Sequence, residues 1–441
     1  MSPANAGSPP PGASRLLARG IGRSQSTRSE PIAVTLNVWG LLQSTRWSLG
    51  LVGLLAYMFA VVTYRLPIGT ASATIAIVGA LLVLQTAKVP RAFLALGAFL
   101  LWAFVSALAS PWVSVSVDAA LEFGKVILVT IAASIILVGS RNALLAMGWF
   151  VLCFVLFPIR GAIIGGDTLV GRMVWNYIYA NPNDLAVLTL LAMGITLALA
   201  QLRWRQKYLR PLLYTAVALE LWVILRTQSR GAALGLVAVA IAALVNATPR
   251  LRRKLLVRGS LALILAVPFI PKETINRYVG GTFATEVELD REQRIAYSSR
   301  EEREHINAAS IRIALGNSLI GVGFGAYPKA LAQAVPELGA KDTHNTYLNV
   351  WCETGLPGLA LLLTFLGLSF QEVRRALQAS KARRADHHQA LLLFSSSVGG
   401  FWVAALFGSY VKLVPPMIVM VLLISYARLV ARESVPATGR A

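Results

Sequence analysis

The sequence predicts an all-α, polytopic membrane protein with about 12 transmembrane helices, each of the roughly 20 apolar residues that span a bilayer. Of its 441 residues, 56% are hydrophobic and only 14% are charged, and the mean hydropathy is +0.64. Soluble domains usually carry closer to a quarter charged residues. Apolar runs also follow one another regularly and are joined by short basic connections, a pattern typical of multi-pass membrane proteins.

The two ends of the chain are predicted to be cytoplasmic tails. Residues 1–46 are rich in Pro, Ser, Gly and Arg and have no sustained apolar period, so they are predicted to be disordered. This segment has no long apolar stretch of the kind found in a cleavable signal peptide. Residues 430–441 form the second, shorter tail.

The apolar runs fall within residues 47–270 and 347–429. Lys and Arg are concentrated in alternate connections between the runs, with 17 in one set and 6 in the short connections of the other, the long loop 271–346 not counted. Because cytoplasmic connections are enriched in Lys and Arg, the more basic set is predicted to be cytoplasmic. The same distribution makes the net charge of +21 a topology signal and argues against nucleic-acid binding. The runs are 48–64, 70–87, 92–109, 119–139, 143–160, 184–202, 209–225, 231–247, 255–270, 347–370, 389–409 and 412–429.

Two of the predicted outer connections are longer than tight turns. Residues 158–183 are rich in glycine and aromatic residues, and residues 271–346 form one long hydrophilic loop. Within that loop the spacing over 299–316 predicts an amphipathic helix. Connections of this length usually have a function, so the 271–346 loop is predicted to be the functional segment.

His344 stands where the long loop meets the next apolar run. Neutral imidazole accepts a proton near pH 7, so His344 is a candidate general base. The other interpretation is that His344 is a helix-start residue beside Asn345 and Tyr347.

Glu353 lies inside the apolar run that follows. A carboxylate inside a membrane is costly and is usually partnered, so Glu353 is interpreted either as a structural hydrogen-bond partner or as a catalytic group. Gly355 is predicted to be a packing or kink position. Solvated surface positions are predicted for the remaining histidines, His305, His387 and His388.

Several arginines lie on the predicted outer side, where the charge bias disfavours them. They could anchor the protein to anionic headgroups. They could also form a phosphate clamp, because guanidinium groups present forked donors that match phosphate oxygens. Arginines from three separate segments are harder to explain as anchors than a single one. The residues are Arg160, Arg172, Arg226, Arg230, Arg300, Arg303 and Arg312.

The sequence lacks the common nucleotide and metal motifs. It contains no GxxxxGK[ST], no HExxH, no paired carboxylates of the DxD type in the outer loops and no Cys/His metal spacing, so neither a metal nor a cofactor is expected. The GVGFG stretch at 321–325 follows no strand and is predicted to be a loop turn. Cys153 and Cys352 are predicted to be packing residues without a disulfide.

Four motifs together resemble the O-antigen ligase and O-antigen polymerase superfamily, bacterial membrane enzymes that transfer glycans from a polyprenyl diphosphate carrier. The resemblance spans residues 170–370. In chain order the motifs are NPND at 181–184, TQSRGAALG at 227–235, an arginine-bearing helix followed by SLIGVGFGAY at 318–327, and HNTYLNVWCETGLPG at 344–358.

The resemblance implies a GT-C-like fold with a periplasmic active site, in which His344 activates the acceptor hydroxyl. Arg230 and an arginine of the loop helix would hold the diphosphate. Arg303 is the best match for that loop arginine and Arg300 the next, although Asn307 stands where the family has a tryptophan. The transfer would be inverting and metal-independent, because arginines can stabilise the diphosphate leaving group. Substrate contacts are also expected from Arg172, Arg226, Arg312, Asn345, Tyr347, Asn181 and Asn183.

The predicted function is transfer of O-antigen polysaccharide from undecaprenyl diphosphate to the lipid A–core oligosaccharide at the bacterial inner membrane. Membrane lipids are expected partners besides this donor and acceptor. The alternatives are a polymerase of the same superfamily and a transporter of polyprenyl-linked lipid. The single long outer loop favours the ligase. A transporter usually places ionisable groups at the midplane and shows repeat symmetry, and this sequence shows neither.

Overall fold

The computed structural model describes residues 36–45, 47–83, 89–137, 141–165, 171–266, 291–381 and 385–434, with the side chains of 44, 258, 262–266 and 291–300 outside this description. Within these ranges the chain is helical, as predicted, and its β pairing is confined to one isolated bridge between Leu36 and Trp204. The predictions made for residues 1–35, 267–290 and 435–441 lie outside the described residues.

Each predicted apolar run corresponds to a helix of the structure. Among the described residues, 7 helices are long and apolar enough to cross a membrane, and α2, α3 and α10 are shorter apolar helices. The two remaining runs correspond to α9 and α11, which carry more charged residues. The helices are α2 (Leu49–Thr63), α3 (Gly69–Leu81), α4 (Arg91–Leu108), α5 (Val113–Leu137), α6 (Asn142–Phe154), α8 (Pro182–Gln201), α9 (Leu209–Arg226), α10 (Arg230–Asn246), α11 (Pro249–Ala266), α15 (Thr346–Ser380), α16 (Ala385–Ala404) and α17 (Val414–Glu433).

The end of the segment predicted to be disordered contains a short helix, α1 (Val38–Ser44). Asn37 caps it by accepting a hydrogen bond from the Trp39 amide at 3.2 Å. The preceding residue, Leu36, exchanges main-chain hydrogen bonds of 2.6 Å with Arg203 and Arg205 in the connection before α9. These long-range partners hold residues 36–45 against the helices. A prediction of disorder from composition alone does not take such partners into account.

Helices α8, α16 and α17 form the buried centre of the molecule. They are apolar around most of their circumference, as expected for helices enclosed by other helices. Helix α16 packs against both α8 and α10, while α15 packs against α4 and α17. Helices α3, α4 and α10 expose many apolar side chains at the periphery, such as Leu101 at 70% and Ile241 at 58%. This distribution fits a bundle whose outer surface faces lipid.

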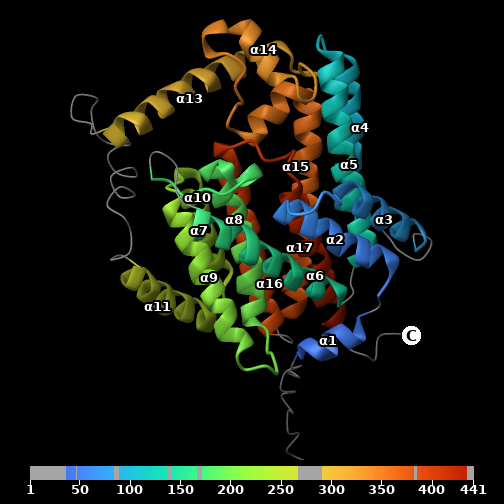
Figure 1. Cartoon of the computed structure of the whole chain (residues 1–441), viewed down its shortest axis with the longest axis vertical. Helices are drawn as coiled ribbons and strands as arrows, with labels where there is room; N and C mark the ends of the chain where they lie inside the picture. Colours follow the sequence, from blue (N-terminus) through green and yellow to red (C-terminus); the bar gives the residue numbers. More distant parts are fainter. Residues whose placement is uncertain are drawn as a thin grey trace, which may run out of the picture.

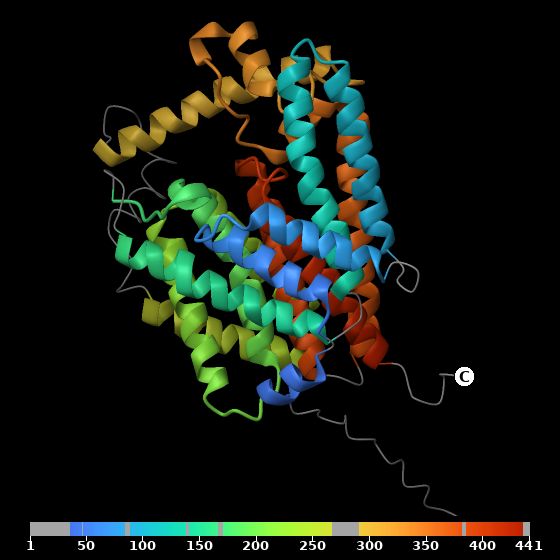
Figure 2. The ribbon, with the colours of Figure 1, turned by 45° about the vertical axis from the view of Figure 1, so that its right-hand side comes forward.

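The long loop places two helices at one end of the molecule, α13 (Arg291–Gly316) and α14 (Tyr327–Ala334) (Figures 1 and 2). Helix α13 contains the predicted amphipathic segment. Its apolar side, with Ile306 and Ala309, packs with Tyr327 and Leu331 of α14 and with Cys352 of α15. The loop helices are therefore seated directly on the first turns of α15.

Helix α15 is broken at Gly355, whose φ of 68° and ψ of −174° are not helical. A Cβ atom at Gly355 would lie 2.4 Å from the carbonyl oxygen of Leu319, so the loop before α14 approaches too closely for any side chain. A break leaves main-chain carbonyls without their helical partners, and buried groups of this kind need other donors. The Glu353 carbonyl accepts from Ser106 Oγ at 2.6 Å, and the Thr354 carbonyl accepts from Trp102 Nε1 at 2.7 Å.

The GVGFG stretch forms the turn that fills this break. Gly321, Gly323 and Gly325 all have positive φ, at 81°, 110° and 84°. The amides of Val322 and Gly323 donate to the carbonyls of Cys352 and Glu353 at 2.9 and 3.1 Å. The glycines thus serve close packing against α15, in agreement with the predicted loop turn.

Two histidines predicted to lie on the surface are buried in the first turn of α16. His387 Nδ1 lies 3.1 Å from Tyr426 Oη, and His388 Nδ1 lies 3.2 Å from Ser380 Oγ. The prediction was wrong because the basic connection ends before Ala385, and α16 is already enclosed by its neighbours at this point. His305 is exposed, as predicted.

Candidate active site

His344 precedes α15 directly, and its backbone has a left-handed φ of 51°. A non-glycine residue rarely adopts this conformation unless its surroundings hold it there. Both neighbours of His344 are held. Asn345 caps α15 by accepting from the amides of Tyr347 and Leu348 at 3.0 and 3.1 Å. The hydroxyl of Thr343, a buried residue, accepts from the Asn345 amide at 3.2 Å, and so spans the turn that carries His344.

Asp342 fastens this turn to two other elements. Its Oδ1 atom accepts hydrogen bonds from the Thr343 amide at 2.8 Å, from Ser409 Oγ at 3.0 Å and from Asn349 Nδ2 at 3.2 Å. Ser409 lies in the connection between the 3-10 turn Ala405–Phe407 and α17, and Asn349 lies near the start of α15. The turn that carries His344 is therefore held by α15 and by the connection before α17.

The same network continues to a buried ion pair. Asn349 Nδ2 lies 3.5 Å from Oε1 of Glu353, and Lys412 Nζ donates to that oxygen at 2.7 Å. The Glu353 side chain is 1% exposed, whereas that of Lys412 is 37% exposed. This arrangement corresponds to the structural interpretation of Glu353, because the carboxylate joins α15 to the connection before α17 and has no exposed surface to offer a substrate.

Arg303, on α13, acts electrostatically on His344. Burial lowers the pKa of His344, the charge of Arg303 lowers it further, and Asp342 and Glu302 oppose this shift. Both burial and a nearby cation disfavour the protonated imidazole. An ion pair between Lys341 and Glu302 also ties α13 to the segment that leads to His344. The imidazole is thus neutral at pH 7, which is the form that accepts a proton.

Tyr410 connects this group to the NPND motif. Burial raises the pKa of the Tyr410 hydroxyl, Asp184 raises it further, Arg303 lowers it and Asp342 raises it. Charges from α8, α13 and the His344 turn therefore surround one phenol. Asp184 lies in the first turn of α8, so this aspartate is the part of the NPND motif that acts on Tyr410.

Arg172 links two of the motifs to each other. Its Nε donates to the carbonyl of Thr227 at 2.8 Å, and its Nη2 donates to Asn183 Oδ1 at 3.0 Å. The next residue, Met173, donates its amide to the carbonyl of Arg226 at 3.1 Å. Arg172 thereby holds the NPND segment against the turn that precedes α10.

Arg230 is the first residue of α10 and is half-buried. The adjacent Gly231 packs so closely that a Cβ atom there would lie 2.9 Å from Cβ of Phe407. The residue after Phe407, Gly408, accepts a hydrogen bond from Thr346 Oγ1 at 2.6 Å. The start of α10 is therefore joined through one short segment to the start of α15, beside His344.

Three other predicted substrate contacts are engaged inside the fold. Asn181 caps α8 by accepting from the amide two residues further on, at 2.9 Å. The Tyr347 hydroxyl donates to the carbonyl of Trp402 at 2.8 Å. The Arg226 guanidinium lies 5.9 Å from the ring centre of Trp222. Each residue therefore has a structural partner at or near the site.

Two of the loop arginines are not placed at this site by the described contacts. Arg312 is exposed and donates from Nε to the Ala308 carbonyl of its own helix at 3.4 Å. The side chain of Arg300 lies outside the described residues. Arg303, the other match to the family's loop arginine, is close enough to His344 to lower its pKa.

The sequence reasoning missed several residues of this cluster. The missed residues lie next to the recognised motifs or in connections that the sequence reasoning treated as short turns. Asp184 and Asp342 each stand within three residues of a residue that it did select, so motif proximity was the available signal. The 409–412 segment carried no such signal, because its approach to His344 depends on how α16 and α17 pack. The missed residues are Asp184, Asp342, Ser409, Tyr410 and Lys412.

Comparison with known proteins gives a family match for the segment that contains the candidate site. A family model described as O-antigen ligase matches residues 215–363, which include α10, the loop helices and the kinked part of α15. No curated protein matches the chain. The matched segment contains Arg230, Arg303 and His344, three residues selected from the motifs. Residues 215–363 are therefore a domain of the O-antigen ligase family, carried by a multi-pass helical membrane protein.

Proposed function

We propose that this protein is a glycosyltransferase that moves O-antigen polysaccharide from undecaprenyl diphosphate to the lipid A–core oligosaccharide, on the periplasmic face of the inner membrane. The observation that carries the proposal is the pairing of His344 with Arg303. A neutral imidazole within electrostatic reach of a half-buried guanidinium combines a base with a phosphate-binding group. The family match supports an enzyme over the transporter alternative.

In the proposed reaction an acceptor sugar hydroxyl attacks the anomeric carbon of the donor glycan directly. His344 takes the hydroxyl proton as the new carbon–oxygen bond forms. The bond between the anomeric carbon and the diphosphate oxygen breaks, and its electron pair leaves with the diphosphate. One displacement inverts the anomeric configuration and needs no second carboxylate, unlike a retaining glycosidase.

In this proposal, arginine side chains stabilise the negative charge of the diphosphate leaving group. Arg303 and Arg230 are assigned to the diphosphate, because forked donors aimed at the developing negative charge stabilise a transition state. Arg172 and Asn183 act by holding the turn before Arg230 in place. Within the described residues, no three His, Cys, Asp or Glu side chains are grouped to hold a metal ion. The proposal assigns charge neutralisation to arginine because guanidinium groups match phosphate oxygens.

The acceptor is expected to reach His344 from the membrane. A lipid-anchored core oligosaccharide enters between helices, and its sugars extend toward the loop helices. The loop layout favours a ligase, because 291–346 carries both Arg303 and His344 while the 158–183 connection is modest. A polymerase of the same superfamily is the second candidate, and the family match is compatible with it.

The two candidates are separated by the lipopolysaccharide of a deletion strain, examined on a gel. The ligase proposal predicts bare lipid A–core, with long polymer accumulating on the carrier lipid. Complementation with wild-type protein restores the ladder, and complementation with His344→Ala does not. A ladder reduced to core plus one repeat would show that ligation persists, and would identify the protein as the polymerase.

A further inference from the structure

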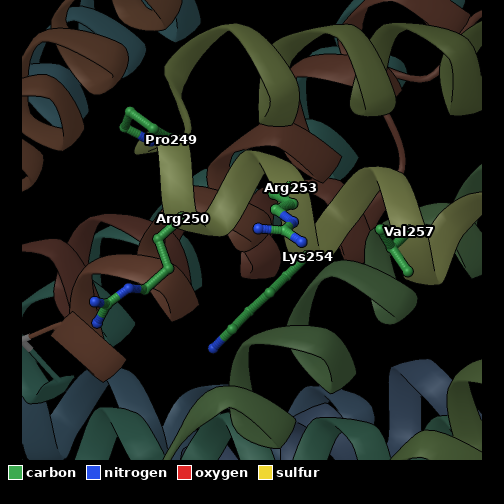
Figure 3. A pocket seen from close by; sticks show the side chains of 5 residues that line it. All are labelled: Pro249, Arg250, Arg253, Lys254 and Val257. Carbon is green, nitrogen blue, oxygen red and sulfur yellow. The ribbon is translucent and has the colours of Figure 1, made fainter.

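A basic pocket of about 840 Å³ lies along the first turns of α11, lined by Pro249, Arg250, Arg253, Lys254 and Val257. The spacing of these residues places them on one side of the helix, since residues three and four apart are neighbours on a helix surface. Figure 3 shows Arg250 and Lys254 reaching into the same open space, with Arg253 beside them. Three cationic side chains thus share one pocket.

This pocket lies at the end of the bundle opposite His344. Leu251, in the first turn of α11, packs with Leu392 of α16 and beside Leu377, near the end of α15. His344 precedes the start of the same helix. At 1.5 Å per residue, the part of α15 between the two sites measures roughly 50 Å. A ligand in the pocket is therefore separate from the substrates proposed for His344.

Other basic residues at this end have partners within the protein. Arg203 forms an ion pair with Asp386 at 2.7 Å, and Arg428 forms one with Glu372 at 2.6 Å. Arg252 donates to the Leu244 carbonyl at 3.0 Å. For the three pocket cations, the described part of the chain supplies no ion pair or hydrogen bond. Like charges on adjacent turns of a helix repel each other, so an anion from outside the chain would stabilise this face.

The surface next to the pocket is apolar. On α11, Leu256 and Leu261 are 51% and 55% exposed, and on the preceding helix α10, Val245 is 67% exposed. Val257, which lines the pocket, is 61% exposed. In a membrane protein such side chains are covered by acyl chains. The pocket therefore lies where a phosphate group and an acyl chain of one molecule could both be bound.

We propose that this pocket binds the headgroup of an anionic phospholipid in the leaflet opposite the candidate active site. Its phosphate lies among Arg250, Arg253 and Lys254, and its acyl chains cover the exposed apolar side chains of α10 and α11. Basic pockets beside membrane helices bind anionic headgroups in this way, with about 1 kcal/mol for each cation. A zwitterionic lipid carries a cation of its own and is therefore bound less tightly.

The test is a lipid titration of the purified full chain in detergent, followed by native mass spectrometry. Dioleoylphosphatidylglycerol is compared with dioleoylphosphatidylcholine, and inorganic phosphate is added as a competitor. The pocket variant is Arg250→Gln/Arg253→Gln/Lys254→Gln. Its matched control, Arg205→Gln/Lys207→Gln/Arg210→Gln, removes three exposed charges from the connection between α8 and α9 and from the first turn of α9, at the same end of the bundle. Melting temperatures establish that both variants remain folded.

The proposal predicts that wild-type protein prefers phosphatidylglycerol. The pocket variant should lose affinity for it on the order of 100-fold, the equivalent of three cations at about 1 kcal/mol each. The control should bind almost as wild type, and inorganic phosphate should not displace the lipid. Equal loss in both variants would show a general charge effect. Equal binding of phosphatidylcholine, or displacement by phosphate, would likewise overturn the proposal.

Discussion

Lys412 Nζ lies 2.7 Å from Oε1 of Glu353, inside the break of α15, and 4.9 Å from the ring centre of Phe324 in the glycine turn. The second carboxylate oxygen, Oε2, has no hydrogen-bond partner among the described residues. Lys412 therefore neutralises a carboxylate that is buried inside the protein. The pair connects three segments that surround His344: the start of α15, the glycine turn and the connection before α17.

This ion pair predicts unequal effects of single and double substitution. Lys412→Met should lower the free energy of unfolding by about 3 kcal/mol, because it leaves an uncompensated buried charge. Lys412→Met/Glu353→Leu should recover part of that loss, since replacing both partners by apolar groups is often nearly neutral. Thermal melting in detergent measures both. A double variant less stable than the single one would contradict this account of the pair.

Gly355 should be intolerant of any side chain. Gly355→Ala places a Cβ atom 2.4 Å from the Leu319 carbonyl oxygen, in a residue with φ of 68°. This combination of positive φ and extended ψ is adopted almost only by glycine and costs about 1–3 kcal/mol for a residue with a Cβ atom, and the contact adds to it. Gly367→Ala, in the same helix with nothing within 4 Å of its Cβ position, is the matched control. Equal melting temperatures for the two variants would refute the role of Gly355 in the break.

The activity should fall on the acid side as His344 becomes protonated. Its pKa lies below the usual histidine value, so the base is neutral at pH 7 and is lost as pH falls through that lowered pKa. Arg303→Gln removes a cation that disfavours protonation, so the acid limb should move to higher pH. Arg303→Lys keeps the charge, and should keep the limb while lowering the rate, because the forked donor is gone. Profiles of kcat/KM against pH measure this. An unshifted limb in Arg303→Gln would exclude a direct effect of Arg303 on His344.

The proposed orientation places the His344 end of the bundle in the periplasm. Single cysteines at Glu337, before His344, and at Lys207, in the connection between α8 and α9, should label differently with an impermeant maleimide in intact spheroplasts. Both positions are exposed, and the native Cys153 and Cys352 are buried. Labelling at Glu337 alone is expected. Labelling at Lys207 alone would reverse the orientation and place His344 in the cytoplasm.

The helices could be predicted from the sequence because their apolar runs are long and are separated by basic connections. The amphipathic segment of α13 was also recognisable, because helical periodicity persists within a polar loop. Helix α1 was not predicted, because it depends on hydrogen bonds between Leu36 and the distant residues Arg203 and Arg205. Local composition contains no information about such partners.

The motifs located the candidate site, but they did not assign roles within it. His344 and Arg303 could be proposed because imidazole and guanidinium have distinctive chemistry. The role of each NPND residue could not be predicted. Asn181 caps α8, and Asp184 acts on Tyr410 only because the fold brings the start of α8 near the connection before α17. The same is true of Ser409, which reaches Asp342 across a gap of more than 60 residues in sequence.

The central claim is that His344 is the base for transfer from a diphosphate carrier to a lipid-anchored acceptor. It is tested most directly by turnover in proteoliposomes that contain undecaprenyl diphosphate-linked O-antigen and lipid A–core, with wild-type protein, His344→Ala and the exposed control His305→Ala. His344→Ala should lower kcat by about 10²–10⁴-fold, the usual contribution of a positioned base, while the melting temperature and the His305→Ala rate remain unchanged. Transfer by folded His344→Ala within tenfold of wild type would contradict the claim.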